Sequence, residues 1–177
     1  MGIVKPTIVS EEKIYVGKRF SVVKRTYAKN SGEVFTREIV LFPEAVVVLP
    51  FISINDIVLI KQFRPTINDY IIEAPAGVVD QGENPDETAR RELVEEIGYY
   101  PKKLVKIASY IPTPGYSTEI LHFYIAKELE YRGAKPEEYE LIEPFIVDFE
   151  TAYRMVLDNK IRDMKTSLAI LIVKNMS

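Results

Sequence analysis

Alternation of apolar and polar positions divides the chain into an N-terminal β region and a larger mixed region. From Lys13 to Val40 the alternation is short, as in "RFSVVKRTYA" and "VFTREIVLF", with a turn at "KNSGE". This pattern predicts a small N-terminal antiparallel β-sheet. Two β-branched runs follow, "AVVVLPFI" and "DIVLIKQF", which we expect to be buried on both faces and joined as a hairpin at "SIND". The predicted boundary lies between residues 1–40 and the main domain of residues 41–177.

Strands and helices alternate in the remainder of the main domain. Strands are predicted at "YIIEAP", "KLVKIASYI", "ILHFYIAKEL" and "IEPFIVDF", and two C-terminal helices at "ETAYRMVLDN" and "TSLAILIVKN". The segments "AGVVDQGE", "PTPGYSTE" and "YRGAKPEEYE" are expected to be loops. The alternation of strands and helices predicts an α/β fold.

A further helix has clear signals at both ends. Asn84 is a suitable N-cap, Pro85 takes the first helical position, and Glu87 completes a capping box. Gly98 is a C-terminal stop signal. Between these signals, Ala89, Leu93 and Ile97 are spaced as a stripe that faces the core.

Composition narrows the chemistry that the chain can carry. Its 177 residues suit one domain with a small appendage, and the net charge of -3 gives no reason to expect a nucleic-acid partner. No apolar run approaches the length of a membrane helix, so we expect a cytoplasmic protein with no membrane partner. Cysteine is absent, which leaves oxygen atoms as the main ligands for a metal and favours a hard cation such as Mg²⁺.

The helix that begins after Asn84 carries an unusual number of carboxylates. Glu92, Glu95 and Glu96 are spaced to lie on or beside one face, where like charges destabilise a helix. One interpretation is a solvated face neutralised by Arg90 and Arg91. The alternative is a divalent cation site, because two arginines leave an excess of negative charge. Spacing alone leaves both interpretations open.

The glycine and glutamate spacing upstream favours the metal site. Gly77, five residues, Glu83, seven residues and then "RELVEEIGY" resembles the Nudix box, G-x5-E-x7-R-E-U-x-E-E-x-G-U, in which U is apolar. Seven fixed letters match, a coincidence with a chance on the order of 10⁻⁹ at one starting position, given an average usage of about 6% per residue. Tyr99 is a mild departure, because an aliphatic residue is more usual there.

Resemblance to the Nudix family implies a fold, a cofactor and roles for the residues of the box. The fold would be an α/β/α sandwich with a mixed sheet, and the cofactor would be Mg²⁺, with Mn²⁺ possible. Arg91 would orient the glutamates as part of the catalytic set, Glu95 would act beside a further metal or its waters, and Glu83 would give electrostatic support. The implied metal ligands are the Ala76 carbonyl, Glu92, Glu95 and Glu96.

The flanks of the box resemble the ADP-ribose pyrophosphatase branch of the family. An arginine like Arg64 in "KQFRP" contacts the substrate phosphates in that branch. A proline loop like "TPGYSTE", with Pro114 and Gly115, also contributes to substrate binding. Two simpler interpretations remain open: Arg64 would make only a salt bridge, and Pro114 and Gly115 would form only a turn.

The catalytic base is predicted from the segment "YELIEPFIVDF". Its E-x-x-E spacing, with Glu140 first and Glu143 last, resembles the segment that supplies a catalytic glutamate in this branch, and Glu140 is the candidate base. The register stays open between these two and the neighbouring Glu137 and Glu138. His122, the one histidine, is expected to be a core or dimer-contact residue.

The segment "FTREIVLF" resembles one that reaches the ligand of a partner subunit in this branch. By that resemblance Arg37, with Tyr27 or Phe20, would contact the partner's substrate, and the protein would be a homodimer. The simpler alternative is that these residues only complete a sheet.

The expected function is Mg²⁺-dependent hydrolysis of ADP-ribose to AMP and ribose 5-phosphate. Another nucleoside diphosphate sugar or a dinucleotide is the alternative substrate. A nucleotide-sensing module without catalysis is the alternative from a different class.

Overall fold

The structure is a computed structural model that describes residues 4–136 and 138–176. The chain divides into two units, which are described separately. Unit 1 comprises Met1–Glu44 and Ile111–Ile120, and unit 2 comprises Ala45–Tyr110 and Leu121–Ser177. The main domain of the chain therefore supplies one loop, Ile111–Ile120, to unit 1.

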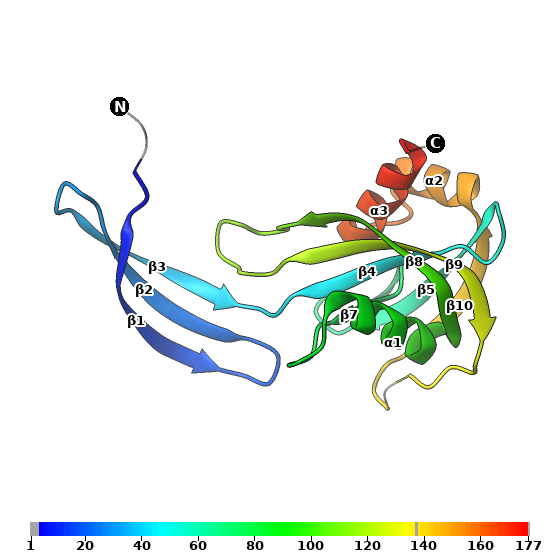
Figure 1. Cartoon of the computed structure of the whole chain (residues 1–177), viewed down its shortest axis with the longest axis horizontal. Helices are drawn as coiled ribbons and strands as arrows, with labels where there is room; N and C mark the ends of the chain where they lie inside the picture. The colour runs from blue at the N-terminus through cyan, green and yellow to red at the C-terminus, as the bar shows by residue number, and fades with distance from the viewer. Residues whose placement is uncertain (1–3, 137, 177) are drawn as a thin grey trace. The chain divides into compact units, whose positions relative to one another are not determined.

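Unit 1 contains a three-stranded antiparallel sheet, drawn in blue and cyan in Figure 1. Its strands are β1 (Thr7–Val16), β2 (Ser21–Ala28) and β3 (Val34–Leu41), in the order β1-β2-β3. The prediction of an N-terminal antiparallel sheet is confirmed. The observed sheet is larger than the pattern indicated, because β1 begins at Thr7, before the alternation is clear.

The loop Ile111–Ile120 is joined to β3 by backbone hydrogen bonds. Val40 donates its N–H to the Tyr116 carbonyl at 2.8 Å, and Thr118 donates to the Val40 carbonyl at 3.0 Å. The Thr118 hydroxyl accepts from the Phe42 N–H at 2.9 Å. These bonds fix the proline loop as a structural part of unit 1.

Unit 2 consists of two sheets and three helices. The helices are α1 (Pro85–Ile97), α2 (Phe149–Leu157) and α3 (Met164–Lys174). One sheet has the order β7-β4-β9-β8 and the other β10-β5-β6. The strands are β4 (Ala45–Pro50), β5 (Asp56–Arg64), β6 (Asp69–Glu73), β7 (Ala76–Val78), β8 (Tyr99–Tyr110), β9 (Leu121–Tyr131) and β10 (Ile142–Asp148).

The predicted hairpin between β4 and β5 is wrong, although both strands are present. β4 pairs with β7 and β9, while β5 pairs with β6 and β10. One isolated bridge, Phe51 to Ile57, links the two segments. The Phe51 N–H bonds the Ala126 carbonyl at 2.8 Å, so the chain continues along β9 before it enters the other sheet. Apolar patterning identified two buried strands but could not identify their hydrogen-bonding neighbours.

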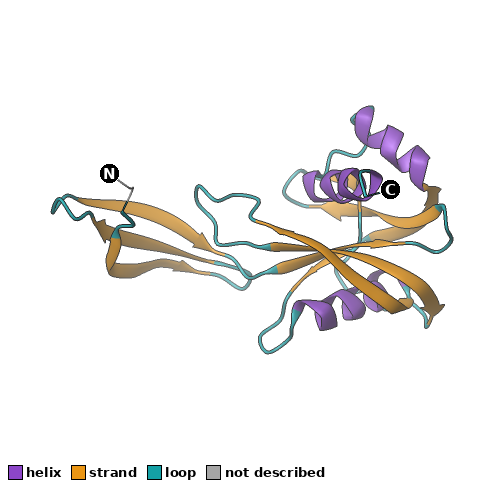
Figure 2. Cartoon of the chain, turned by 45° about the horizontal axis from the view of Figure 1, so that its top comes forward, coloured by secondary structure: helices purple, strands orange, loops and turns teal. Residues whose placement is uncertain are grey.

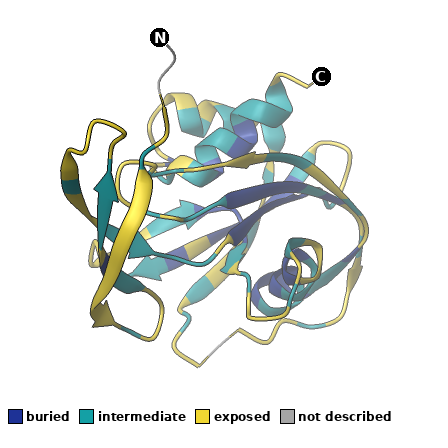
Figure 3. Ribbon diagram, turned by 60° about the vertical axis from the view of Figure 1, so that its left-hand side comes forward, coloured by how far each residue is buried: buried dark blue, intermediate teal, exposed yellow. Residues whose placement is uncertain are grey.

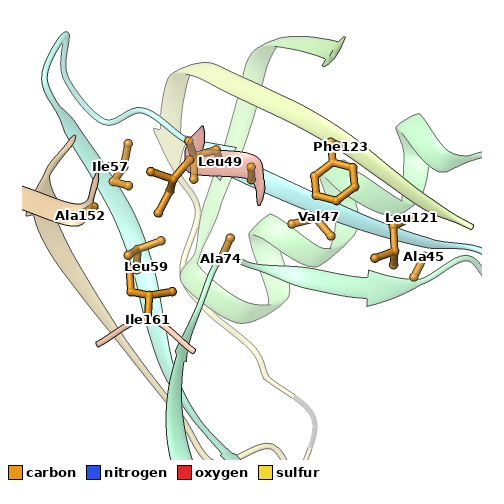
Figure 4. Packing of buried hydrophobic residues seen from close by; sticks show 12 residues of the cluster. Ala45, Val47, Leu49, Ile57, Leu59, Ala74, Leu121, Phe123, Ala152 and Ile161 are labelled. Atoms are coloured by element: carbon orange, nitrogen blue, oxygen red, sulfur yellow. The ribbon is translucent and has the colours of Figure 1, made fainter. Parts of the chain in front are cut away.

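Alternate residues of β4 pack on opposite sides of its sheet. Val47 and Leu49 belong to a core cluster that includes residues of α2 and α3, whereas Val46 and Val48 belong to a cluster with α1. Figure 2 shows α1 on one side of the strands of unit 2 and the other two helices on the opposite side. Figure 4 shows the first cluster, which also takes residues from β5 and β9. The α/β/α arrangement with a mixed sheet is as predicted.

Burial differs sharply between strands. Every residue of β4 is buried, whereas every residue of β1 is exposed (Figure 3). Of the described residues in unit 1, Val23 alone is fully buried. The part of the chain that the structure describes contains no helix with the length and apolarity needed to cross a membrane.

Candidate active site

The predicted signals for α1 set its observed ends. Asn84 accepts a hydrogen bond from the Glu87 N–H at 3.0 Å, and Glu87 accepts from the Asn84 N–H at 3.1 Å, which completes the capping box. Gly98 ends the helix with a φ of 78°. Ala89, Leu93 and Ile97 face the core and are buried. These contacts determine which face of α1 carries its glutamates.

Two of the helix glutamates are buried in unit 2. Glu92 is 8% exposed and Glu96 is 2% exposed, whereas Glu95 is partly exposed. Arg90 does not neutralise them, because it donates to the Pro101 carbonyl and lies over the Tyr100 ring. A fully solvated, arginine-neutralised face therefore does not describe this helix.

Arg91 connects three of the glutamates. Its Nε and Nη2 donate to the two carboxylate oxygens of Glu83 at 2.9 and 3.0 Å. Its Nη1 donates to Glu92 at 2.8 Å and to Glu95 at 2.9 Å. Thr88 also donates to Glu83, at 2.8 Å. One guanidinium thus fixes the orientation of three carboxylates, while the catalytic part implied for Arg91 stays a prediction.

Gly77 leaves the space that the Glu92 carboxylate fills. A Cβ atom at position 77 would lie 1.9 Å from Cδ and Oε1 of Glu92, far inside any allowed contact. Gly77 belongs to the short strand β7, at a place where the sequence pattern predicts a loop. The glycine of the motif is therefore required by close approach of a side chain, not by an unusual φ angle.

The neighbouring Ala76 is tied to the second buried glutamate. The Ala76 N–H donates to Oε2 of Glu96 at 3.0 Å. Ala76 pairs with Val47 of β4, and Gly77 pairs with Val46. The strand that carries Ala76 and Gly77 is therefore held against both β4 and the carboxylate face of α1.

Burial has a marked effect on the acidity of these side chains. It raises the pKa of Glu92 to about 7, although Arg91 acts in the opposite direction and the negative charges of Glu95 and Glu140 raise it further. Burial and the charge of Glu92 also raise the pKa of Glu96 well above its usual value. The pKa of Glu83 is instead lowered to about 2, because Arg91 bonds its ionised form. An additional positive charge near Glu92 and Glu96 would stabilise both carboxylates.

These donors fit a hard divalent cation. Among the residues that the structure describes, no group of three or more histidine, cysteine, aspartate or glutamate side chains forms a ready set of metal ligands. The predicted set combines the backbone carbonyl of Ala76 with Glu92, Glu95 and Glu96, and these three side chains do not gather as such a group. Oxygen donors, excess negative charge and buried carboxylates suit Mg²⁺ or Mn²⁺.

Glu140, the candidate base, affects the two buried glutamates Glu92 and Glu96 electrostatically. Its negative charge raises the pKa of both Glu92 and Glu96. Glu143 is exposed and lies opposite Lys61 in the register of β10 and β5. Glu138 is also exposed, and Glu137 lies outside the described residues. The charge of Glu140 therefore acts on both buried glutamates, and the choice among the four candidate bases stays a prediction.

Arg64 is held by a buried carboxylate that the sequence analysis did not identify. Its Nε and Nη2 donate to the two oxygens of Glu73 at 2.6 and 2.7 Å, and Lys165 donates to the same carboxylate. Glu73 is 0% exposed. Burial by itself raises the pKa of Glu73, but bonds from Arg64 and the charge of Lys165 outweigh burial and lower it. Arg64 therefore makes a salt bridge, as the simpler of its two interpretations predicts, and its partner lies on β6. The Nη1 atom of Arg64 takes no part in this pair.

The other predicted substrate residues gather in unit 1. Arg37, Pro114 and Gly115 line one pocket of about 320 Å³. Tyr27 and Phe35 line the same pocket and stack with ring centroids 5.2 Å apart. Arg37 lies over the Phe35 ring at 5.2 Å. The remaining residues that line the pocket are Arg25, Ile39, Tyr116, Ser117 and Thr118.

Two further predicted residues have clear positions. Phe20 stacks with Phe42 and does not line this pocket, so Tyr27 is the aromatic candidate that accompanies Arg37. His122 is 7% exposed on β9, and its Nδ1 lies 2.9 Å from the Ser109 hydroxyl. Its burial in a strand agrees with the expected core position.

Sequence reasoning missed residues whose contacts are distant along the chain. Glu73 is the one acidic residue in the predicted strand "YIIEAP". A charged residue among positions expected to be buried is a signal that it has a partner. Asp163 and Thr166 in "DMKT" have the spacing of a helix cap, which was also readable. Their tertiary partners were not.

Comparison with known proteins agrees with this geometry. The family model "NUDIX domain" matches residues 41–168. An ADP-ribose pyrophosphatase from Bacillus subtilis is 38% identical over 164 residues, 92% of this chain and 89% of the relative. A methanol dehydrogenase activator from Bacillus methanolicus is 32% identical over the same shares. A GDP-mannose pyrophosphatase from Salmonella typhimurium is 30% identical over 90% of this chain and 91% of the relative.

A solved structure described as an ADP compounds hydrolase has the same fold. It superposes with a TM-score of 0.88 at 22% sequence identity, covering 99% of this chain and 96% of that one. The box residues, the family model and the full-length relatives lead to one conclusion: the chain belongs to the Nudix hydrolase family.

Proposed function

We propose that the protein is a homodimeric, Mg²⁺-dependent pyrophosphatase that cleaves ADP-ribose to AMP and ribose 5-phosphate. The observation that carries the catalytic part is the buried pair Glu92 and Glu96 beside Gly77. Identity of 38% to an ADP-ribose pyrophosphatase across nearly the whole chain supports the substrate. Mn²⁺ is the alternative metal.

The metal ligands in this proposal are the Ala76 carbonyl, Glu92 and Glu96, with Glu95 beside them. When bound, Mg²⁺ supplies a Lewis acid that activates water and neutralises charge on the diphosphate. Gly77 provides the space for the Glu92 carboxylate, and Arg91 holds Glu92 and Glu95 in orientation. This fixed arrangement limits the reorganisation needed during the reaction.

Glu140 is proposed to act as the general base. It would orient the attacking water and accept its proton, a role open to a carboxylate placed within hydrogen-bonding reach of the reacting water. The effect of its charge on Glu92 and Glu96 supports a position facing the same site. No nucleophile from the protein is required.

Two arginines are proposed to bind substrate. Arg64 is held by Glu73 through Nε and Nη2, which leaves Nη1 to contact a phosphate without a search for orientation. Arg37, Tyr27 and Phe35 in the pocket of unit 1 combine a cation with stacked aromatic rings, a suitable surface for a nucleotide base and its ribose. Pro114 and Gly115 would complete the lining of the same pocket.

Dimerisation is supported by the exposed apolar surface of unit 1. All ten residues of β1 are exposed, and they include Ile8, Val9, Ile14 and Tyr15. A three-stranded sheet ordinarily needs a packed apolar face for stability. A second subunit is the proposed cover, and residues 1–40 are the proposed dimerisation segment. Light scattering coupled to gel filtration should give twice the mass of 20.3 kDa, and a monomer across micromolar concentrations would oppose the proposal.

The choice of substrate has a direct competitor. The 30% identity to a GDP-mannose pyrophosphatase favours testing other nucleoside diphosphate sugars. The 32% identity to a methanol dehydrogenase activator makes a role in binding another enzyme a second candidate.

A substrate panel tests the proposal. Purified protein with Mg²⁺ is assayed on ADP-ribose, ADP-glucose, GDP-mannose, diadenosine polyphosphates and nucleoside triphosphates. We expect the highest kcat/KM for ADP-ribose, with AMP and ribose 5-phosphate as products. A higher kcat/KM for GDP-mannose would overturn the substrate assignment, and ADP-ribose binding without turnover of any compound would favour a sensor.

A further inference from the structure

Helices α2 and α3 begin with the same capping motif, an aspartate followed three residues later by a threonine. Asp148 accepts from the Thr151 N–H at 2.9 Å and hydroxyl at 3.1 Å. Asp163 accepts from the Thr166 N–H at 2.9 Å and hydroxyl at 2.5 Å. As caps, the two pairs are closely matched.

The surroundings of the two threonines are different. Thr151 is exposed, whereas Thr166 is 0% exposed. The Thr166 hydroxyl also accepts a hydrogen bond from the Ala74 N–H at 2.7 Å, a residue 92 positions earlier in the chain. Because its single hydrogen is donated to Asp163, the hydroxyl presents its lone pairs to Ala74. The cap of α3 thus extends into the strand region that precedes the Nudix box.

The three residues Ala74–Ala76 are each held by a different element. Ala74 is bonded to Thr166 of α3, and the Pro75 carbonyl accepts from the Val48 N–H of β4 at 2.9 Å. The Ala76 N–H donates to Glu96 of α1 at 3.0 Å. The labelled Ala74 in Figure 4 lies in the same core cluster as residues of α3. Proline restricts the backbone between the two alanines, so a shift at Ala74 is passed to Ala76.

We propose that Thr166 is a positioning residue. By holding Ala74 it fixes the segment Ala74–Ala76, and thereby keeps Ala76 and Glu96 in the geometry needed for metal binding. The inference rests on the proposed function in one respect, that Ala76 and Glu96 are metal ligands. Partners that orient metal ligands commonly change metal affinity by about 10–100-fold when they are removed. A residue that served only as a helix cap would change stability but leave metal affinity unaltered.

The test compares three variants with the parent protein by titrating the metal-free forms with Mn²⁺. Thr166→Val keeps the shape but removes the hydroxyl, Thr166→Ser keeps the hydroxyl, and Thr151→Val removes the matched hydroxyl of α2. We expect Thr166→Val to bind Mn²⁺ at least tenfold more weakly, with Thr166→Ser and Thr151→Val within twofold of the parent. Amide exchange at Ala76 in the metal-free protein should also be faster in Thr166→Val alone.

Enzyme kinetics add a second readout. Thr166→Val should lower kcat on ADP-ribose about tenfold or more at a fixed Mg²⁺ concentration, with a small change in KM. A folded Thr166→Val protein with the Mn²⁺ affinity of the parent would overturn the inference. If Thr166→Val does not fold, Thr166→Cys, whose thiol is a weaker acceptor, is compared with Thr166→Ser, and equal affinities would overturn it.

Failure of the proposed function would look different. A parent protein that binds Mn²⁺ but does not hydrolyse ADP-ribose would overturn the substrate assignment, while the Mn²⁺ titrations would still decide the role of Thr166. A parent protein that binds no Mn²⁺ would overturn both the metal site and this inference.

Discussion

The glutamate face of α1 and the pocket of unit 1 are built in opposite ways. Glu92 and Glu96 are buried, and their orientation is fixed by Arg91 and the Ala76 N–H. The pocket is open, and among the described residues its Arg37 forms no ion pair and lies over an aromatic ring. The glutamate face of α1 is thus held in a fixed geometry that suits chemistry, whereas the pocket of unit 1 is exposed and suits recognition. Substitutions in the first should lower kcat, and substitutions in the second should raise KM.

The largest expected effect comes from Glu96→Gln. Loss of one ligand charge should lower kcat on ADP-ribose about 10³-fold, as for loss of a major electrostatic contact in an active site. The metal-free variant should melt at a higher temperature than the parent, because a buried carboxylate with a raised pKa has been removed. Glu150→Gln, at an exposed position of α2 that is paired with Lys174 of α3, is the control; it should match the parent in kcat and melt no higher than the parent, because exposed ion pairs contribute little to stability. Parent-like turnover by Glu96→Gln would remove the metal role assigned to this residue.

Gly77→Ala should lower kcat about 100-fold, which is comparable to loss of a partner that orients a metal ligand. The new Cβ would displace the Glu92 carboxylate from the place it occupies beside β7. The fold should survive, because the displaced atoms are the end of a flexible side chain.

A double-mutant cycle with Glu92→Gln sharpens this prediction. Since both changes act on one carboxylate, their effects on kcat should be strongly non-additive. Additive losses would mean that Gly77 acts through something other than Glu92.

Stability of the metal-free protein should depend on pH in a direction set by Glu92. Its folded pKa of about 7 lies above the unfolded value, so the folded state binds more protons between roughly pH 4.5 and 7. Stability should therefore fall as pH rises through that window, by on the order of 2 kcal/mol from this group. Denaturant melts in EDTA at pH 5 and pH 7.5 measure the change. Glu92→Gln should reduce it, and an equal change in parent and variant would contradict the assignment.

Arg37→Ala should have the smallest of these effects, an increase in KM for ADP-ribose of about tenfold with little change in kcat, as for loss of one charged hydrogen bond. Arg19→Ala is a suitable control, since Arg19 is an exposed arginine of unit 1 that does not line the pocket. Molecular mass should be measured for each variant, so that a change in subunit association is not mistaken for lost recognition. A kcat effect without a KM effect would break the division between the two regions.

Local signals allowed parts of the fold to be predicted closely. Asn84, Pro85 and Gly98 specify the ends of α1 through contacts within a few residues, and the structure agrees. The short strand β7 was missed because its three residues pair with β4, about 30 positions away. The β4 and β5 hairpin was wrong for the same reason, since pairing partners are decided by the tertiary structure.

The candidate site shows the same limit. Gly77 and Glu92 were linked by motif spacing, and the structure gives the reason in the clash that any Cβ would cause. Glu73 and Thr166 were missed because their importance lies in contacts to Arg64 and Ala74 that no spacing reveals. Arg91, which orients the glutamates, lay within the motif and was predicted, whereas Glu73 and Thr166 contact residues outside it and were not.

Anomalous diffraction from crystals grown with Mn²⁺ would locate the proposed metal site itself. We expect a peak bounded by the Glu92 and Glu96 carboxylates and the Ala76 carbonyl, and its loss in crystals of Glu96→Gln. A peak at other carboxylates, with none beside Glu92 and Glu96, would contradict the proposed metal site.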